Sequence, residues 1–180
     1  MIQDIKRIDR IHRYKGTVLD VYEDVMMIDG REAHWDFIHH NGAAAVVPVD
    51  ADGKILMVRQ YRNALERVTL EIPAGKLDTP DEPAIVCAAR ELEEETGQRS
   101  DDLEFLIRVH STVAFCDEKI DIYVARNLVP TAQRLDADEA IDVERWDIED
   151  LVQLAYDGQL TDSKTVAAVM AYHAKFPSEQ

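Results

Sequence analysis

The chain has 180 residues, of which 46% are hydrophobic and 31% charged, enough for one domain with a buried core or one domain plus a small appendage. A formal net charge of −16 argues against general attraction to nucleic acid or to an anionic membrane surface. Two cysteines, Cys87 and Cys116, have no metal-type spacing and suit a reducing compartment. With no apolar leader and no long apolar run, we expect a cytoplasmic protein.

An antiparallel β-hairpin is expected near the start of the chain. Its strand-forming runs, rich in Val, Ile, Thr and aromatic residues, lie at 17–22, 25–28 and 33–38. The pair Asp29-Gly30, between the last two runs, is a strong hairpin-turn signal. A hairpin of this size cannot bury both faces alone, so we expect it to lie on the main domain or on a partner subunit.

The hairpin region is expected to end at Asn41-Gly42, which divides the chain into 1–42 and a main domain at 43–180. Apolar runs in the main domain predict strands at 43–49, 54–62, 69–73, 103–109, 120–125 and 141–146. Apolar residues at helical intervals predict two closing helices, at 148–156 and 162–176. Strands with flanking helices indicate an α/β or α+β fold.

A further helix, from about Asp81 to Gly97, carries the densest chemistry of the chain. Asp81 is the expected N-cap, Pro83 belongs to the first turn, and Gly97 is suited to end the helix. The helical period gathers the charged residues Arg90, Glu91, Glu94 and Glu95 on one face and the apolar residues Ile85, Ala89 and Leu92 on the other. We expect the apolar face to pack.

The acidic face of this helix is unfavourable without a cation. Like charges four residues apart, as at Glu91 and Glu95, cost an isolated helix about 0.2 to 0.5 kcal/mol per pair. A divalent cation reverses the sign of that interaction, and Mg²⁺ accepts carboxylate oxygens while keeping some waters for a phosphate-bearing substrate. A solvated acidic face is the alternative, and for an arbitrary Glu-rich helix it is the common one. The spacing of the motif favours the metal site.

That spacing resembles the signature of the Nudix hydrolases, G-x5-E-x7-R-E-U-x-E-E-x-G-U, where U is aliphatic. The matching residues are Glu82, Arg90, Glu91, Leu92, Glu94, Glu95 and Gly97. Two positions depart, because six residues instead of five separate Gly75 from Glu82, and Gln98 replaces the last aliphatic residue. The resemblance implies a Nudix-type α/β/α sandwich with an N-terminal antiparallel hairpin subdomain.

The wider sequence is similar to the ADP-ribose pyrophosphatase branch of that family. The similarity rests on Gln60-Tyr61-Arg62, on the run 71–77, on Asp117-Glu118-Lys119 and on the acidic loop 135–140. Members of this branch are typically dimers whose N-terminal region reaches across to the other subunit, so the resemblance implies a homodimer with 1–42 as its dimerisation region. ADP-ribose enzymes usually carry Ser-Pro-Gly where this chain has residues 112–114, Thr-Val-Ala, which leaves another nucleoside diphosphate sugar open as substrate.

The resemblance also assigns roles by position. The expected ligands of Mg²⁺, or of Mn²⁺, are Glu91, Glu94, Glu95 and the backbone carbonyl of Ala74. Arg90 is expected to orient the carboxylates. Together with Glu94 and the loop carboxylate Glu139, Arg90 makes up the expected catalytic set, with Asp138 as the alternative to Glu139.

Substrate contacts are expected from Arg62, whose planar guanidinium suits a phosphate group. A further contact is expected from Glu118, which matches a position that contacts substrate across the dimer in this branch. The role of Glu82 stays open, because the extra residue lies beside it. No histidine is assigned a role. The predicted partner is thus a small nucleotide sugar, with no nucleic acid or membrane partner.

The predicted activity is Mg²⁺-dependent hydrolysis of the diphosphate bond of ADP-ribose or a related nucleoside diphosphate sugar. The products are a nucleoside monophosphate and a sugar phosphate. Two alternatives remain: a non-catalytic sensor that binds a nucleotide sugar in the same pocket, and a housecleaning enzyme that acts on nucleoside triphosphates.

Overall fold

The computed structural model describes residues 4–17, 19–137 and 139–177. Asp138, the alternative loop carboxylate, therefore lies outside the described residues. Within the described ranges, no helix is both long and apolar enough to cross a membrane.

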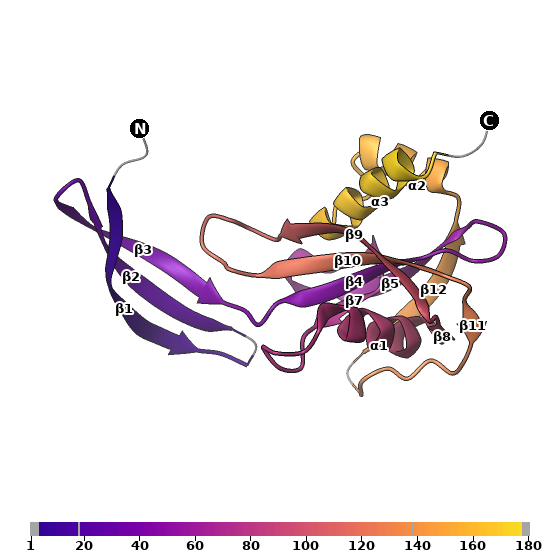
Figure 1. Ribbon diagram of the computed structural model, residues 1–180, viewed down its shortest axis with the longest axis horizontal. Coiled ribbons are helices and arrows are strands. Elements are labelled where there is room, and N and C mark those ends of the chain that lie inside the picture. Colours follow the sequence, from indigo (N-terminus) through magenta and orange to yellow (C-terminus); the bar gives the residue numbers. More distant parts are fainter. Residues whose placement is uncertain (1–3, 18, 138, 178–180) are drawn as a thin grey trace.

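The N-terminal residues form a sheet that stands to one side of the remaining structure (Figure 1). Its strands β1 (Ile5–Lys15), β2 (Asp20–Ile28) and β3 (Arg31–His39) pair antiparallel in that order. The expected antiparallel unit is confirmed and is larger by one strand. Its turn at Asp29-Gly30 has φ angles of 48° and 78°, as a tight hairpin turn requires.

The central sheet has four strands in the order β7-β4-β10-β9. The strands β4 (Ala43–Pro48) and β10 (Lys119–Arg126) are parallel, and the edge strands β7 (Ala74–Lys76) and β9 (Asp102–His110) are antiparallel to them. Because the inner strands β4 and β10 are parallel, their C-terminal ends lie at the same end of the sheet although they are far apart in the sequence. The strand expected at 69–73 does not extend into β7, which begins at Ala74; it overlaps the strand at Arg67–Glu71.

A second, antiparallel sheet contains β12 (Ile141–Trp146), β5 (Ile55–Arg62) and β6 (Arg67–Glu71). A short 3₁₀ turn (Asn63–Leu65) connects β5 to β6. The two-residue strands β8 (Gln98–Arg99) and β11 (Val129–Pro130) pair with each other.

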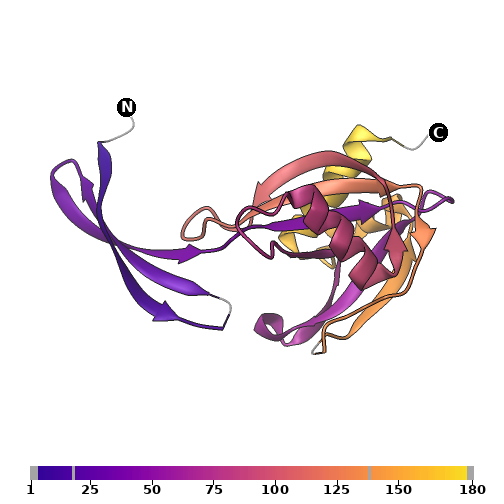
Figure 2. The same cartoon turned by 60° about the horizontal axis from the view of Figure 1, so that its bottom comes forward.

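Helices cover both faces of the central sheet (Figure 2). Alternation along β4 sends Ala43, Ala45 and Val47 into the main core, beneath α2 (Ile148–Tyr156) and α3 (Ser163–Lys175). Its other face sends Ala44 and Val46 toward α1 (Ala84–Thr96). The expected α/β/α arrangement and both closing helices are confirmed.

The helix α1 differs from its prediction at its start and in its buried face. It begins at Ala84 with Pro83 as N-cap and without a side-chain cap, so the expected N-cap at Asp81 is wrong. Glu82 instead closes the preceding turn, where its carboxylate accepts a hydrogen bond from Asp78 N at 2.7 Å. Ile85 is 43% exposed, because the helix turns a different set inward: Cys87, Ala88, Leu92, Glu95 and Thr96.

The N-terminal sheet is joined to the turn that precedes β10. Ile38 N donates to Phe115 O at 2.7 Å, and Asp117 N donates to Ile38 O at 3.3 Å. The Asp117 carboxylate accepts from His40 N at 2.8 Å and contacts His39 Nδ1 at 2.8 Å. This junction fixes β3 against residues 115–117.

Candidate active site

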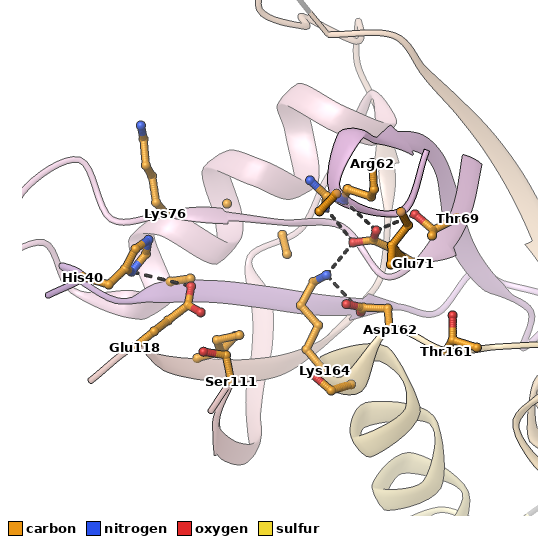
Figure 3. Close-up of a pocket in the computed structure, with 17 residues that line it drawn as sticks. His40, Arg62, Thr69, Glu71, Lys76, Ser111, Glu118, Thr161, Asp162 and Lys164 are labelled. Carbon is orange, nitrogen blue, oxygen red and sulfur yellow. Dashed lines mark hydrogen bonds and ion pairs between the residues drawn. The ribbon is translucent and has the colours of Figure 1, made fainter. Parts of the chain in front are cut away.

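Two cavities border the short strand β7. The acidic cavity, of about 520 Å³, is lined chiefly by α1 and by the loop before β12. The ion-pair cavity, of about 490 Å³, lies between β6, β7 and the start of α3 (Figure 3). Four residues line both cavities: Arg62, Ala74, Gly75 and Lys76. The two cavities are therefore neighbours with a common wall.

Arg90 organises the carboxylates of α1 in the acidic cavity. Its Nη1 donates to Glu91 Oε1 at 2.6 Å and to Glu94 Oε2 at 3.2 Å. Its Nη2 donates to the carbonyl of Lys76 at 3.2 Å, which ties the helix to β7. Charge-assisted hydrogen bonds of this kind hold carboxylates in a fixed orientation.

Glu95 is the most deeply buried carboxylate of this cavity, with 4% of its surface exposed. Its Oε2 accepts a hydrogen bond from Ala74 N at 3.0 Å. Burial raises the pKa of Glu95 to about 8, and the nearby charges of Glu91 and Glu139 add to the shift. Burial likewise raises the pKa of Glu91, against the opposing effect of Arg90.

Gly75 lets β7 approach the helix closely. A Cβ atom at this position would lie 2.0 Å from Glu91 Oε1 and 2.2 Å from its Cδ. Any larger residue would thus displace either the strand or the Glu91 carboxylate. The first glycine of the motif is needed for space at the acidic cavity.

The donor chemistry of the cavity fits a hard divalent cation. Carboxylate oxygens are the ligands that Mg²⁺ and Mn²⁺ take in proteins, and a cation would relieve the unfavourable burial of Glu91 and Glu95. Among the described residues, no three His, Cys, Asp or Glu side chains are arranged as a ready metal site. Arg90 holds one oxygen of each of two carboxylates, Glu91 Oε1 and Glu94 Oε2.

The loop that carries Glu139 is fastened to the C-terminal end of α1. Gln133 Nε2 donates to Glu95 O at 2.7 Å and to Ile141 O at 3.2 Å. Arg134 N donates to Glu94 O at 2.9 Å. These bonds bring Glu139 into the lining of the acidic cavity, although they join residues far apart in the sequence.

Gln133 could not be predicted from the sequence, because a glutamine in a loop has no distinctive pattern. The loop carboxylate itself is held locally, since Glu139 Oε2 accepts from Asp136 N at 3.1 Å. Asp136 also lines the cavity and was not among the predicted residues.

The ion-pair cavity is built around Glu71, which is only 2% exposed. Arg62 donates to both of its oxygens, from Nε at 2.7 Å and from Nη2 at 2.6 Å. Lys164 Nζ lies 2.5 Å from Glu71 Oε2, and Thr69 Oγ1 donates to Oε1 at 2.7 Å. Burial opposes the ionisation of Glu71, but these three donors outweigh it and lower its pKa to about 2.

The predicted site residues separate into two groups in space. Glu91, Glu94, Glu95, Arg90 and Glu139 line the acidic cavity together, with Ala74 at its wall. Glu118 lines the ion-pair cavity instead, where its Oε1 lies 3.5 Å from His40 Nδ1. Arg62 borders both cavities. Sequence reasoning missed Glu71 and Lys164, since their contact joins residues 93 positions apart.

Comparison with known proteins finds matches over most of the chain. The model of the NUDIX domain matches residues 39–169. The chain is 36% identical over 173 residues to the ADP-ribose pyrophosphatase of Bacillus subtilis, covering 94% of this chain and 93% of the relative. It is 32% identical over 176 residues to the ADP-ribose pyrophosphatase of Mycobacterium tuberculosis, covering 95% and 84%.

Two further matches extend the comparison. The chain is 40% identical over 159 residues to the methanol dehydrogenase activator of Bacillus methanolicus, covering 87% of this chain and 85% of the relative. The crystal structure of an ADP compounds hydrolase superimposes with a TM-score of 0.85 at 22% identity, covering 97% and 95% of the two chains. At that identity the superposition establishes the fold.

Proposed function

The chain belongs to the Nudix hydrolase family as a Nudix diphosphatase, and from this premise we propose that it hydrolyses ADP-ribose or a related nucleoside diphosphate sugar in the acidic cavity. The observation that carries the proposal is the gathering of Glu91, Glu94, Glu95 and Glu139 around one cavity whose wall includes Arg62. The relatives named ADP-ribose pyrophosphatases support this substrate class.

In the proposed site, Glu91, Glu94, Glu95 and the carbonyl of Ala74 hold Mg²⁺ or Mn²⁺. The bound cation supplies charge neutralisation of the diphosphate and of the leaving phosphate. Arg90 keeps Glu91 and Glu94 on the cavity side of the helix.

The proposed nucleophile is water, and Glu139 accepts its proton. One phosphorus–oxygen bond forms to the water oxygen, and the bond to the bridging oxygen breaks. The products are a nucleoside monophosphate and a sugar phosphate. Glu139 is suited to this role because its backbone and carboxylate are both held by Asp136, at 3.0 and 3.1 Å.

Arg62 is the proposed phosphate contact at the wall between the cavities. A guanidinium has five N–H donors, of which Arg62 uses one on Nε and one on Nη2 for Glu71. The remaining donors are available to a diphosphate. Glu118, in the ion-pair cavity, is the proposed contact for hydroxyl groups on one end of the substrate.

The N-terminal sheet supports a homodimer in which residues 1–42 form the dimerisation region. Large apolar side chains of this sheet are exposed, including Ile8 at 54%, Tyr14 at 63% and Trp35 at 47%. A sheet of three strands with such faces is suited to being covered by a second copy. Light scattering at micromolar concentration should give twice the mass of the 20.5 kDa chain.

The test of the activity is a panel of nucleotide sugars and nucleoside triphosphates with Mg²⁺, assayed with the parent protein and with Glu95→Gln. We expect the parent to cleave at least one nucleotide sugar, and the variant to lose kcat by roughly 10² to 10⁴-fold while its circular dichroism is unchanged. Equal turnover by both proteins would remove Glu95 from the site. Cleavage of triphosphates alone would favour the housecleaning alternative, and tight binding without turnover would favour the sensor.

A further inference from the structure

A buried network links Arg62 to the first turn of α3. Glu71, at the end of β6, accepts hydrogen bonds from both Arg62 and Lys164 (Figure 3). Lys164 also donates to Asp162 Oδ2 at 2.9 Å. Lys164 is 8% exposed, which is unusual for a lysine and requires paired charges. Four charged groups therefore form a chain from α3 to the wall that both cavities share.

The start of α3 fixes one end of this chain. Asp162 is the N-cap of the helix, where its side chain accepts from Thr165 N at 3.0 Å. Thr165 Oγ1 in turn accepts a hydrogen bond from Ile72 N at 3.0 Å, next to Glu71. Because α3 and the end of β6 are bonded to each other, the positions of Lys164 and Glu71 are set by the fold.

The other end of the chain is the Arg62 guanidinium. Its two bonds to Glu71 define the plane of the group and point the unused Nη1 away from Glu71. Lys164 shares Oε2 of Glu71 with Arg62 Nη2 and also pairs with Asp162, so the four side chains carry two charges of each sign. The Glu71 carboxylate is thus fixed by α3 as well as by Arg62.

We propose that Glu71 and Lys164 are positioning residues, which hold the Arg62 guanidinium in the orientation that receives the substrate diphosphate. The proposal rests on the proposed function, in which Arg62 contacts that diphosphate. Glu71 orients the guanidinium, and Lys164 fixes the Glu71 carboxylate. Neither residue has to touch the substrate.

The sign of the effect of Glu71→Gln distinguishes positioning from a general electrostatic effect. Removing a negative charge close to an anionic substrate would, by Coulomb attraction alone, tighten substrate binding. Loss of the charge-assisted pair would instead leave Arg62 free to adopt other rotamers and weaken binding. Positioning therefore predicts a higher KM for Glu71→Gln, opposite to the electrostatic expectation.

The experiment compares Glu71→Gln, Lys164→Arg and the double variant Glu71→Gln/Lys164→Met with the parent. The double variant removes one charge of each sign, so that no unpaired buried charge prevents folding. The matched controls are Glu104→Gln and Lys175→Met, because Lys175 Nζ also joins α3 to a strand through a carboxylate, at 2.6 Å, but in an exposed pair. Each protein is assayed for kcat and KM, and for the Kd of ADP with Mg²⁺ by calorimetry.

For both Glu71→Gln and the double variant, we expect KM and the Kd of ADP to rise by roughly tenfold and kcat to change by less than about threefold. Lys164→Arg, which keeps a cation beside Glu71, should retain most of the parent's affinity, and the controls should match the parent. An unchanged or lower KM and Kd in Glu71→Gln would overturn the proposal while leaving the activity established. Because ADP binding needs no turnover, a parent that binds ADP but cleaves nothing still decides the role of Glu71, and a parent that does neither overturns both proposals.

Discussion

Glu71 and Glu95 are buried to nearly the same extent, at 2% and 4% exposure, and they lie in neighbouring cavities. Their pKa values nevertheless move in opposite directions, to about 2 for Glu71 and to about 8 for Glu95. Glu71 has two cations and a hydroxyl as partners, whereas the hydrogen bond that lowers the pKa of Glu95 comes from a backbone amide. Burial alone does not decide the charge of a carboxyl group.

This contrast separates a carboxylate with charged protein partners from one that we propose to be a ligand of a cation. A buried charge with complete protein partners favours the folded state, while a buried charge without them has an unfavourable charged form until a cation arrives. The difference can be tested by removing a partner, by lowering the pH, by adding the cation or by removing the charge itself.

The largest effect is expected from removing the lysine that pairs with Glu71. Lys164→Met should lower the free energy of unfolding by roughly 3 to 5 kcal/mol, because it leaves a buried carboxylate with one cation fewer. Urea denaturation measures the change. The exposed counterpart Lys175→Met, whose partner is Glu104, should cost about 1 kcal/mol or less. Equal losses in the two variants would mean that burial of the pair has no energetic importance.

The contribution of the ionised Glu71 to stability should also appear in the pH dependence of the free energy of unfolding. The folded-state pKa of Glu71, about 2, lies below its ordinary value of 4.5, so its contribution is present above pH 4.5 and is lost as pH falls toward 2. The loss amounts to about 3 kcal/mol. In Glu71→Gln the decline between these pH values should be shallower than in the parent, and a parallel decline would contradict the assigned pKa.

Magnesium should stabilise the fold through the other glutamate. If the cation binds the acidic cavity only in the folded protein, a concentration of 100 times its Kd adds about 2.7 kcal/mol to the free energy of unfolding. Thermal unfolding with MgCl₂ should therefore occur at a higher temperature than in EDTA with NaCl of the same ionic strength. The gain should be small or absent in Glu95→Gln. A gain of the same size in that variant would place the cation elsewhere.

The smallest expected effect is a gain in stability when the charge of Glu95 is removed. Without metal, at pH 7, Glu95→Gln should raise the free energy of unfolding by about 1 to 2 kcal/mol, since the amide can still accept from Ala74 N and has no charge to bury. Denaturation in EDTA measures the change. A lower stability than the parent would show that the Glu95 charge is already satisfied by the protein.

The sequence predicted most of the fold because its signals are local. The strand at 141–146 and the helix at 148–156 match β12 and α2, and Gly97 ends α1 with a φ angle of 65°. The strand β1 was missed because most of it is exposed and its charged residues obscure the alternation. The start of α1 was misplaced because Asp81 resembles a cap, whereas the extra residue extends the turn up to Pro83.

The candidate site likewise contains residues that local sequence signals predict and residues that they do not. The residues on α1 were predictable because one helix carries them at fixed intervals. Glu71 lies in a recognisable run, but nothing local indicates that its partner is Lys164, on a helix that begins far later in the chain. Gln98, which departs from the signature, begins the short strand β8 and pairs with Pro130. Gln98 is only half-buried, so a polar side chain is compatible with this position.

The junction between β3 and residues 115–117 has a consequence for protein engineering. Because Ile38 exchanges backbone hydrogen bonds with Phe115 and Asp117, the N-terminal sheet and that turn form one structural module encoded in two separate pieces. A chimaera that takes only residues 1–42 from a relative would pair a foreign strand with a native turn and lose the Asp117 contacts with His39 and His40. The transferable unit is the N-terminal segment together with the turn at 111–118.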